Sequence, residues 1–135
     1  MLTAFQKWYK THKKQESARH KNYYKTHKQE RLIYNIAWHR NHPWYKSWQH
    51  AKARCQNAND SAYQYYGKRG IKFFMAPEDF KLLWFKYKAS KMRKPSIDRI
   101  NNNDHYKLSN CRFIEFSENS KKARVEAIRR DNHAI

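Results

Sequence analysis

Apolar residues recur at helical spacing in a first stretch that begins after Pro43. One helical face carries four of them: Trp44, Trp48, Ala51 and Cys55. Intervals of four, three and four residues are typical of an amphipathic helix. A proline fits the start of a helix, and the polar residues 57–61 form a helix-breaking cluster. The pattern predicts a helix that begins after Pro43, ends before residue 57 and contributes its apolar face to a core.

A second apolar stripe follows residues 77–79, where a proline and two acidic residues stand together. That triplet is typical of the first turn of a helix, because acidic side chains interact favourably with the positive end of the helix dipole. The stripe has intervals of three, one and three residues and consists of Phe80, Leu83, Trp84 and Tyr87. It predicts a second helix that packs into the core.

Between these helices lie both glycines of the chain, Gly67 and Gly70. Glycine permits a positive φ or a close approach of backbones, so Lys68 and Arg69 are expected on a tight turn. The apolar residues at 71–74 then indicate a short strand. The turn could clamp a phosphate group, or it could be an ordinary turn that happens to be basic.

Residues 96–119 predict a strand, a polar loop, a strand and the start of a helix. The strands are expected at 96–100 and 110–114, joined through the turn-forming residues 101–104. Ser117 is expected as the N-cap of the helix, because a serine side chain can accept a hydrogen bond from the first turn. We therefore predict an α+β fold that is predominantly α, with a small ββα unit.

The N-terminal part of the chain contains an internal repeat. Trp8–Lys13 recurs 15 residues later as Tyr23–Lys28 and decays into residues 38–43. Because no glycine or proline precedes Pro43, the segment is expected to be helical, as one helix or as several. We predict two regions: a basic, aromatic-rich helical arm at 1–43 and a second region at 44–135.

The charge of the chain gives information about its partner. The chain has 30 Lys and Arg against 11 acidic residues, a net charge of +19. Residues 1–50 hold 11 basic and 2 acidic residues, residues 51–94 hold 11 and 3, and residues 95–135 hold 8 and 6. Such a surplus indicates a polyanionic partner. Nucleic acid, double-stranded DNA first, is the expected partner, and an anionic membrane surface is the alternative.

Other classes lack their sequence signals. No apolar run is long enough to span a bilayer, and the N-terminus lacks the apolar core of a secretory signal, so we expect a cytoplasmic protein without a membrane partner. The two cysteines, Cys55 and Cys111, have no C-x-x-C spacing; they are expected to be reduced and buried rather than zinc ligands. No phosphate-binding glycine loop or dinucleotide motif indicates a small-molecule cofactor.

Basic side chains interleaved with aromatic ones are typical of surfaces that bind nucleic acid. In the arm they could lie on phosphates, or the arm could be a solvated basic helix whose aromatic residues pack on the rest of the protein. The residues predicted to contact nucleic acid are Lys10, Lys13, Lys25, Lys28, Arg40, Lys52, Arg54, Lys68, Arg69, Lys72, Arg112, Lys121 and Arg124.

The ββα stretch also carries a family resemblance. The segment Ser96–Asn101, the segment Asn110–Phe113 and the triplet Ser117–Asn119 resemble the ββα core of HNH (His-Me finger) endonucleases of phage and homing type. Tyr66–Ile71 resembles a motif that precedes this core in small phage proteins. The resemblance covers roughly residues 44–124.

The resemblance implies a metal-dependent endonuclease that nicks or cleaves DNA in the cytoplasm, the host cytoplasm for a phage protein. It implies one divalent cation, Mg²⁺ rather than zinc, held by Asp98 and Asn119, and a loop braced by Asn110. Arg99 stands where the family has its histidine base, and a guanidinium does not accept a proton at neutral pH. Either His105 is the base and Arg99 steadies the phosphate, or the protein binds DNA or RNA without cleaving it. His105 could also be an ordinary loop histidine.

Overall fold

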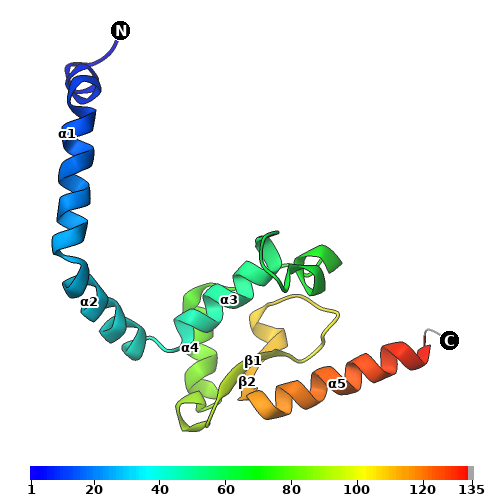
Figure 1. Ribbon diagram of the computed structural model, residues 1–135. Coiled ribbons are helices and arrows are strands. Elements are labelled where there is room, and N and C mark those ends of the chain that lie inside the picture. The colour runs from blue at the N-terminus through cyan, green and yellow to red at the C-terminus, as the bar shows by residue number, and fades with distance from the viewer. Residues whose placement is uncertain (134–135) are drawn as a thin grey trace. The chain divides into compact units, whose positions relative to one another are not determined.

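The computed structural model describes residues 1–133 and divides the chain into two compact units, Met1–Asn41 and His42–Ile135 (Figure 1). The expected boundary between arm and second region was residue 43.

The first unit consists of two helices, α1 (Ala4–Thr26) and α2 (Lys28–Asn41), separated at His27. The arm is therefore not one continuous helix, a point that the sequence left open. Thr3 caps α1 in a reciprocal arrangement with Gln6, in which each side chain bonds to the backbone of the other. Neither helix has a buried residue. Packing within this unit therefore contributes little to the stability of its helices.

The two repeat units of the arm adopt the same local structure. The ring of His12 stacks on Trp8 at 4.5 Å between centroids, and its Nδ1 lies 2.8 Å from the Trp8 carbonyl oxygen. His27 stacks on Tyr23 at 4.0 Å, with its Nδ1 2.9 Å from the Tyr23 carbonyl oxygen. The first copy of the repeat, Trp8–Lys13, lies entirely within α1. The second copy, Tyr23–Lys28, contains the end of that helix, at Thr26.

In the second unit, α3 (Trp44–Gln56) and α4 (Pro77–Lys86) pack against each other. The predicted apolar faces are confirmed. Helix α3 begins and ends close to where the sequence placed it, and α4 begins at Pro77 as expected and ends at Lys86, one residue before Tyr87. The buried residues of the two helices are Trp44, Ala51, Cys55, Phe80, Leu83 and Trp84. Trp48 and Tyr87 are partly buried against the same core.

A tight turn follows α3, as predicted, and consists of two short 3₁₀ helices, Tyr63–Tyr65 and Gly67–Arg69. A Cβ atom at Gly67 would lie 2.3 Å from the Cys55 carbonyl oxygen, so only glycine fits there. Gly70 has a φ of 87°, which other residues rarely adopt. The turn is thereby held against the end of α3.

The strand predicted at 71–74 is wrong. That segment forms one parallel β-bridge, between Phe73 and Tyr106, with hydrogen bonds on either side from Tyr106 N to Lys72 O (3.0 Å) and from Phe74 N to Tyr106 O (2.8 Å). Of its apolar residues, Ile71 is buried in the core and Phe73 packs against it, whereas Phe74 is exposed. A short apolar run cannot distinguish a strand from an extended buried loop.

The predicted ββα unit is present. Strand β1 (Pro95–Arg99) pairs antiparallel with β2 (Cys111–Glu115), and α5 (Phe116–His133) follows directly. Because α5 begins at Phe116, Ser117 lies within its first turn and is not its N-cap. The fold class, α+β and predominantly α, is confirmed. Among residues 1–133, no helix is long and apolar enough to cross a membrane.

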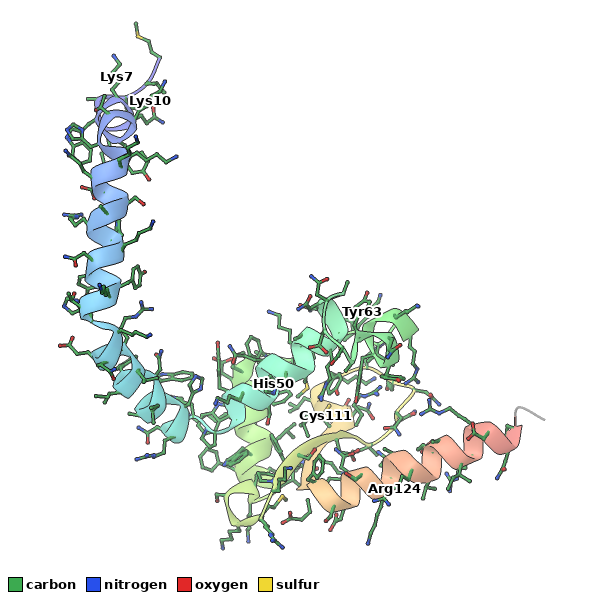
Figure 2. The ribbon with its side chains drawn as sticks, in the orientation of Figure 1. Lys7, Lys10, His50, Tyr63, Cys111 and Arg124 are labelled. Atoms are coloured by element: carbon green, nitrogen blue, oxygen red, sulfur yellow. The ribbon has the colours of Figure 1, made fainter. Side chains whose placement is uncertain are left out.

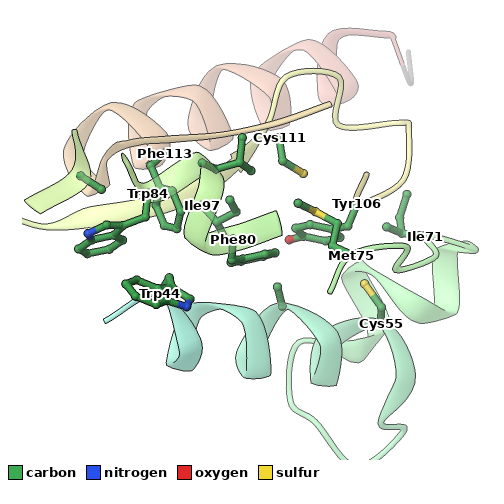
Figure 3. Close-up of a cluster of buried hydrophobic side chains, with 13 residues drawn as sticks. Trp44, Cys55, Ile71, Met75, Phe80, Trp84, Ile97, Tyr106, Cys111 and Phe113 are labelled. Atoms are coloured by element: carbon green, nitrogen blue, oxygen red, sulfur yellow. The ribbon is translucent and has the colours of Figure 1, made fainter. Parts of the chain in front are cut away.

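The core lies between the helix pair and one face of the sheet (Figure 3). Ile97 and Phe113 are opposite each other in the strand register, and Phe113 makes edge-to-face contacts with Phe80 and Trp84. Each such fully buried side chain contributes about 2 kcal/mol of stability. Cys55 and Cys111 are both buried and free, as predicted.

Candidate functional site

The centre of the candidate site is the carboxylate of Asp98, which is 3% exposed. Successive residues of a strand point to opposite faces, so Asp98 lies on the face opposite to Ile97, next to α5. Its register partner on β2 is Arg112, whose Nε donates a hydrogen bond of 2.9 Å to Oδ2. Its other oxygen, Oδ1, accepts a hydrogen bond of 2.8 Å from Nζ of Lys122 on α5. The buried carboxylate is thus paired with two cations.

Lys122 binds more than the carboxylate. Its ammonium also donates to the carbonyl oxygens of Arg99 and, at 3.2 Å, of Ile100. A lysine ammonium has three protons, and three oxygen atoms accept them here. Lys122 was not among the residues predicted from the sequence. It follows Asn119 by three positions, so both lie on the same helix face, and this spacing is the signal that could have identified it.

Asn119, the second predicted metal ligand, holds α5 on β1. Its Nδ2 donates to Oγ of Ser96 at 2.8 Å and to the carbonyl oxygen of Ile97 at 3.1 Å. The amide nitrogen is therefore directed at the strand backbone. Asp98 and Asn119 are close neighbours in the fold because they lie on β1 and on the helix face that packs on β1.

The residues present do not fit a divalent cation in this arrangement. A hard cation takes its ligands from several oxygen atoms, mostly carboxylate and carbonyl oxygens. Both oxygens of Asp98 already accept hydrogen bonds from cationic groups, and Lys122 occupies the carbonyl oxygens beside it. Within residues 1–133, no three His, Cys, Asp or Glu side chains form a group that could hold a metal. Magnesium binding stays a prediction, and it requires the Lys122 ammonium to move away.

Arg99 points away from Asp98, because it is the next residue of the strand. It is 6% exposed, and its guanidinium lies over the neighbouring rings of Tyr66 and Tyr106, at 5.2 and 5.1 Å from their centroids. Its Nη1 donates to the carbonyl oxygens of Asn102 (2.6 Å) and Asp104 (2.8 Å). These contacts make Arg99 a brace of the loop between the strands.

His105 is held by the backbone rather than free in solvent. Its Nδ1 accepts a hydrogen bond of 3.0 Å from the backbone N–H of Lys72. In a neutral ring that bond places the proton on Nε2, so neither nitrogen is available to remove a proton from water. The arrangement does not support the role of general base that was considered for this residue. Beside it, the Lys107 ammonium and the backbone N–H of His105 hold the pKa of Asp104 below its ordinary value.

Asn110 braces the same loop, the role that the resemblance implied for it. The side chain is 6% exposed. Its Oδ1 accepts from the Asn101 N–H at 2.9 Å, and its Nδ2 donates to the carbonyl oxygens of Asn101 (3.1 Å) and His105 (3.0 Å). All three hydrogen bonds of its side-chain amide go to backbone groups of the loop, so Asn110 fixes the shape of the loop.

The basic residues predicted to contact nucleic acid divide into two groups. Most are exposed, in the first unit and in the second, and none of these exposed ones forms an ion pair among residues 1–133: Lys10, Lys13, Lys25, Lys28, Arg40, Lys52, Lys68, Arg69, Lys72, Lys121 and Arg124. Lys10 and Arg124 are labelled on α1 and α5 in Figure 2.

The other two are partly buried. Arg112 is paired with Asp98, and Arg54 packs over the Tyr66 ring and donates to the Tyr106 hydroxyl at 3.3 Å. A contact between Arg54 and nucleic acid stays a prediction, although its side chain is oriented toward the protein. It lies on the polar side of α3, where the helix meets the tyrosine pair that also contacts Arg99, and periodicity within α3 could not reveal that contact.

Comparison with known proteins gave no match: no family model, no curated protein and no solved structure is significantly similar to the chain. A function for the chain therefore has to be inferred from its own residues.

Proposed function

We propose that this protein binds nucleic acid, with double-stranded DNA as its ligand, in the cytoplasm and without metal-dependent cleavage. Support for binding comes from the net charge of +19. Only four ion pairs form among residues 1–133, so most of the positive charge is available to a polyanion. Phosphate contacts by such side chains supply most of the affinity of non-specific DNA binding.

The observation that separates binding from cleavage is the contact between Lys122 and Asp98. A metal-dependent nuclease of the HNH type needs the acidic residue of the first strand to bind a cation that stabilises the leaving oxygen. Here the side chain of Lys122 supplies a positive charge at that carboxylate. Together with the hydrogen-bonded Nδ1 of His105, this favours a ββα unit that serves as a binding scaffold.

The second candidate is the HNH-like endonuclease. The observation that favours it is the ββα unit itself, with Asp98, Asn110 and Asn119 on the elements expected of that family. For this function Lys122 must release Asp98 when DNA and Mg²⁺ bind together.

One experiment compares the two candidates. The protein is incubated with supercoiled plasmid in Mg²⁺, in Mn²⁺ and in excess EDTA, and each sample is analysed both for DNA retention and for open-circle or linear product. We expect equal retention in all three conditions and no product. Nicking that requires metal and disappears in Asp98→Asn would establish the nuclease instead. Competition by single-stranded DNA and by RNA of equal length then identifies the preferred ligand.

A further inference from the structure

A pocket of about 200 Å³ lies at the end of the sheet, where the Gly67–Arg69 turn, the loop after β1 and α5 come together. In Figure 1 the yellow loop lies between the green turn region and α5. Arginines from three elements line the pocket, namely Arg69, Arg99 and Arg130, and no acidic residue lines it. Residues that are distant in the sequence thus bring three guanidinium groups to one cavity.

The positive charge in this pocket is not compensated internally. Among the residues that the structure describes, neither Arg69 nor Arg130 forms an ion pair. Lys122 also lines the pocket, but its ammonium is neutralised by Asp98. Burial and the nearby charges of Arg130 and Arg99 lower the pKa of Arg69, which indicates that the guanidinium groups are close enough to repel one another.

The Arg69 side chain is oriented by its surroundings. Its Nη1 donates to the Tyr65 carbonyl oxygen at 3.1 Å, and its Nη2 donates to Oδ1 of Asn103 at 3.3 Å. The first bond lies within the turn, and the second joins the turn to the loop after β1. A guanidinium has five N–H donors, so the remaining ones are available to a ligand. Side chains that are already ordered lose less entropy when they bind.

We infer that this pocket binds a single phosphate group between Arg69 and Arg130. Arginine is suited to this ligand because its planar donors match the phosphate oxygens in pairs. Under the function proposed above, on which this part of the inference rests, the phosphate belongs to a nucleic-acid strand. Tyr65 lines the same pocket and is 60% exposed, so its ring is accessible to the adjoining sugar or base.

A thermal shift experiment on the full chain tests the pocket without nucleic acid. Unfolding is measured in sodium phosphate and in sodium chloride of equal ionic strength. Three proteins are compared: the native chain, Arg69→Gln/Arg130→Gln, and the control Lys68→Gln/Arg129→Gln, which removes the same charge from the same turn and helix. We expect phosphate to raise the Tm of the native chain and of the control by about 3 °C and not that of the pocket variant. Equal shifts in all three proteins would overturn the pocket.

The single variant Arg130→Gln guards against a folding defect, because Arg130 is exposed on α5. It should reduce the phosphate shift while retaining the native Tm in chloride. An unchanged phosphate shift in this variant would remove Arg130 from the site.

Fluorescence anisotropy with a labelled DNA duplex identifies the source of the phosphate. We expect the Kd of the pocket variant to rise about tenfold more than that of the control, because the pocket variant loses a charge-assisted bidentate contact to a phosphate. Equal weakening in both variants, with the phosphate shift still specific, would assign the pocket to a free phosphate compound and leave DNA binding to the other contacts. A native chain that responds to phosphate but binds no duplex would overturn the proposed function and not the pocket.

Discussion

The ammonium of Lys122 on α5 lies 2.8 Å from the carboxylate of Asp98 on β1, and the two residues are 24 positions apart in the chain. The contact joins the helix of the ββα unit to its first strand at a buried carboxylate. A charge in such a place is costly unless it is paired and hydrogen-bonded. The pair therefore stabilises the fold, and its ammonium occupies an oxygen atom that a metal ion would need.

Replacing Lys122 by Met should lower the free energy of unfolding by about 2–4 kcal/mol, because Asp98 would keep only Arg112 as a partner. It should also create affinity for a divalent cation at the vacated position. Denaturant unfolding with and without MnCl₂ measures both effects, with Lys121→Met, an exposed neighbour, as the control. Stabilisation of the native chain by Mn²⁺ to the same degree as Lys122→Met would contradict the exclusion of metal by the ammonium.

Replacing Asn110 by Ala should destabilise the protein by about 2–4 kcal/mol, because one backbone N–H and two carbonyl oxygens of a partly buried loop lose their partners. Asn110→Asp keeps the acceptor for the Asn101 N–H and removes both donated bonds. Asn110→Asp should lose less stability than Asn110→Ala if the accepted hydrogen bond contributes most. Chemical denaturation of the native chain and the two variants measures their free energies of unfolding and so ranks them. A native-like stability of Asn110→Ala would show that the loop is held mainly by Arg99.

Stability should fall at alkaline pH in a way that depends on Cys111. Burial raises the pKa of its thiol from 9.0 to about 11. Below pH 9 the thiol is protonated in the folded and in the unfolded state, and its contribution to stability is fully present. Between pH 9 and about 11 the thiol of the unfolded chain loses its proton first, so the free energy of unfolding falls by about 2 kcal/mol.

The measurement is the difference between the native chain and Cys111→Ala in denaturant unfolding at several pH values, since their many lysines titrate alike. The difference should change across this range. Parallel curves would mean that the thiol titrates normally. Burial also raises the pKa of Tyr106 to about 12, so its effect begins only above pH 10.

Removing residues 1–42 should weaken DNA binding and reduce the slope of log affinity against log salt concentration by several units. The reason is that the exposed basic residues of the arm would no longer displace counterions. Titrations of both proteins at four salt concentrations measure the slope. A truncated chain with the native slope would mean that the arm makes no phosphate contacts and is a solvated helix.

The helices of the core followed from the sequence because periodicity reports burial directly. In α3 and α4 the apolar stripes became the buried faces. The strand predicted at 71–74 does not form, because this segment makes only one bridge, between Phe73 and Tyr106, and the local pattern does not reveal that partner.

The candidate site was only half predictable. The positions of Asp98, Asn110 and Asn119 on the ββα unit followed from their neighbours in sequence. The partners of Asp98 and Arg99 did not, since these are Lys122 on α5 and the rings of Tyr66 and Tyr106. A charged residue in a motif does not indicate whether its partner will be a ligand or another side chain.

The repeat in the arm defines a length as well as a motif. Fifteen residues of α-helix extend about 22 Å, and successive phosphates of one DNA strand advance by about 3.4 Å along the duplex axis. On the proposed function, the histidine-stacked units at Trp8 and Tyr23 would meet the backbone six or seven nucleotides apart, by about this arithmetic. A duplex shorter than that distance could engage one unit but not both, so the affinity of the arm should rise stepwise with oligonucleotide length.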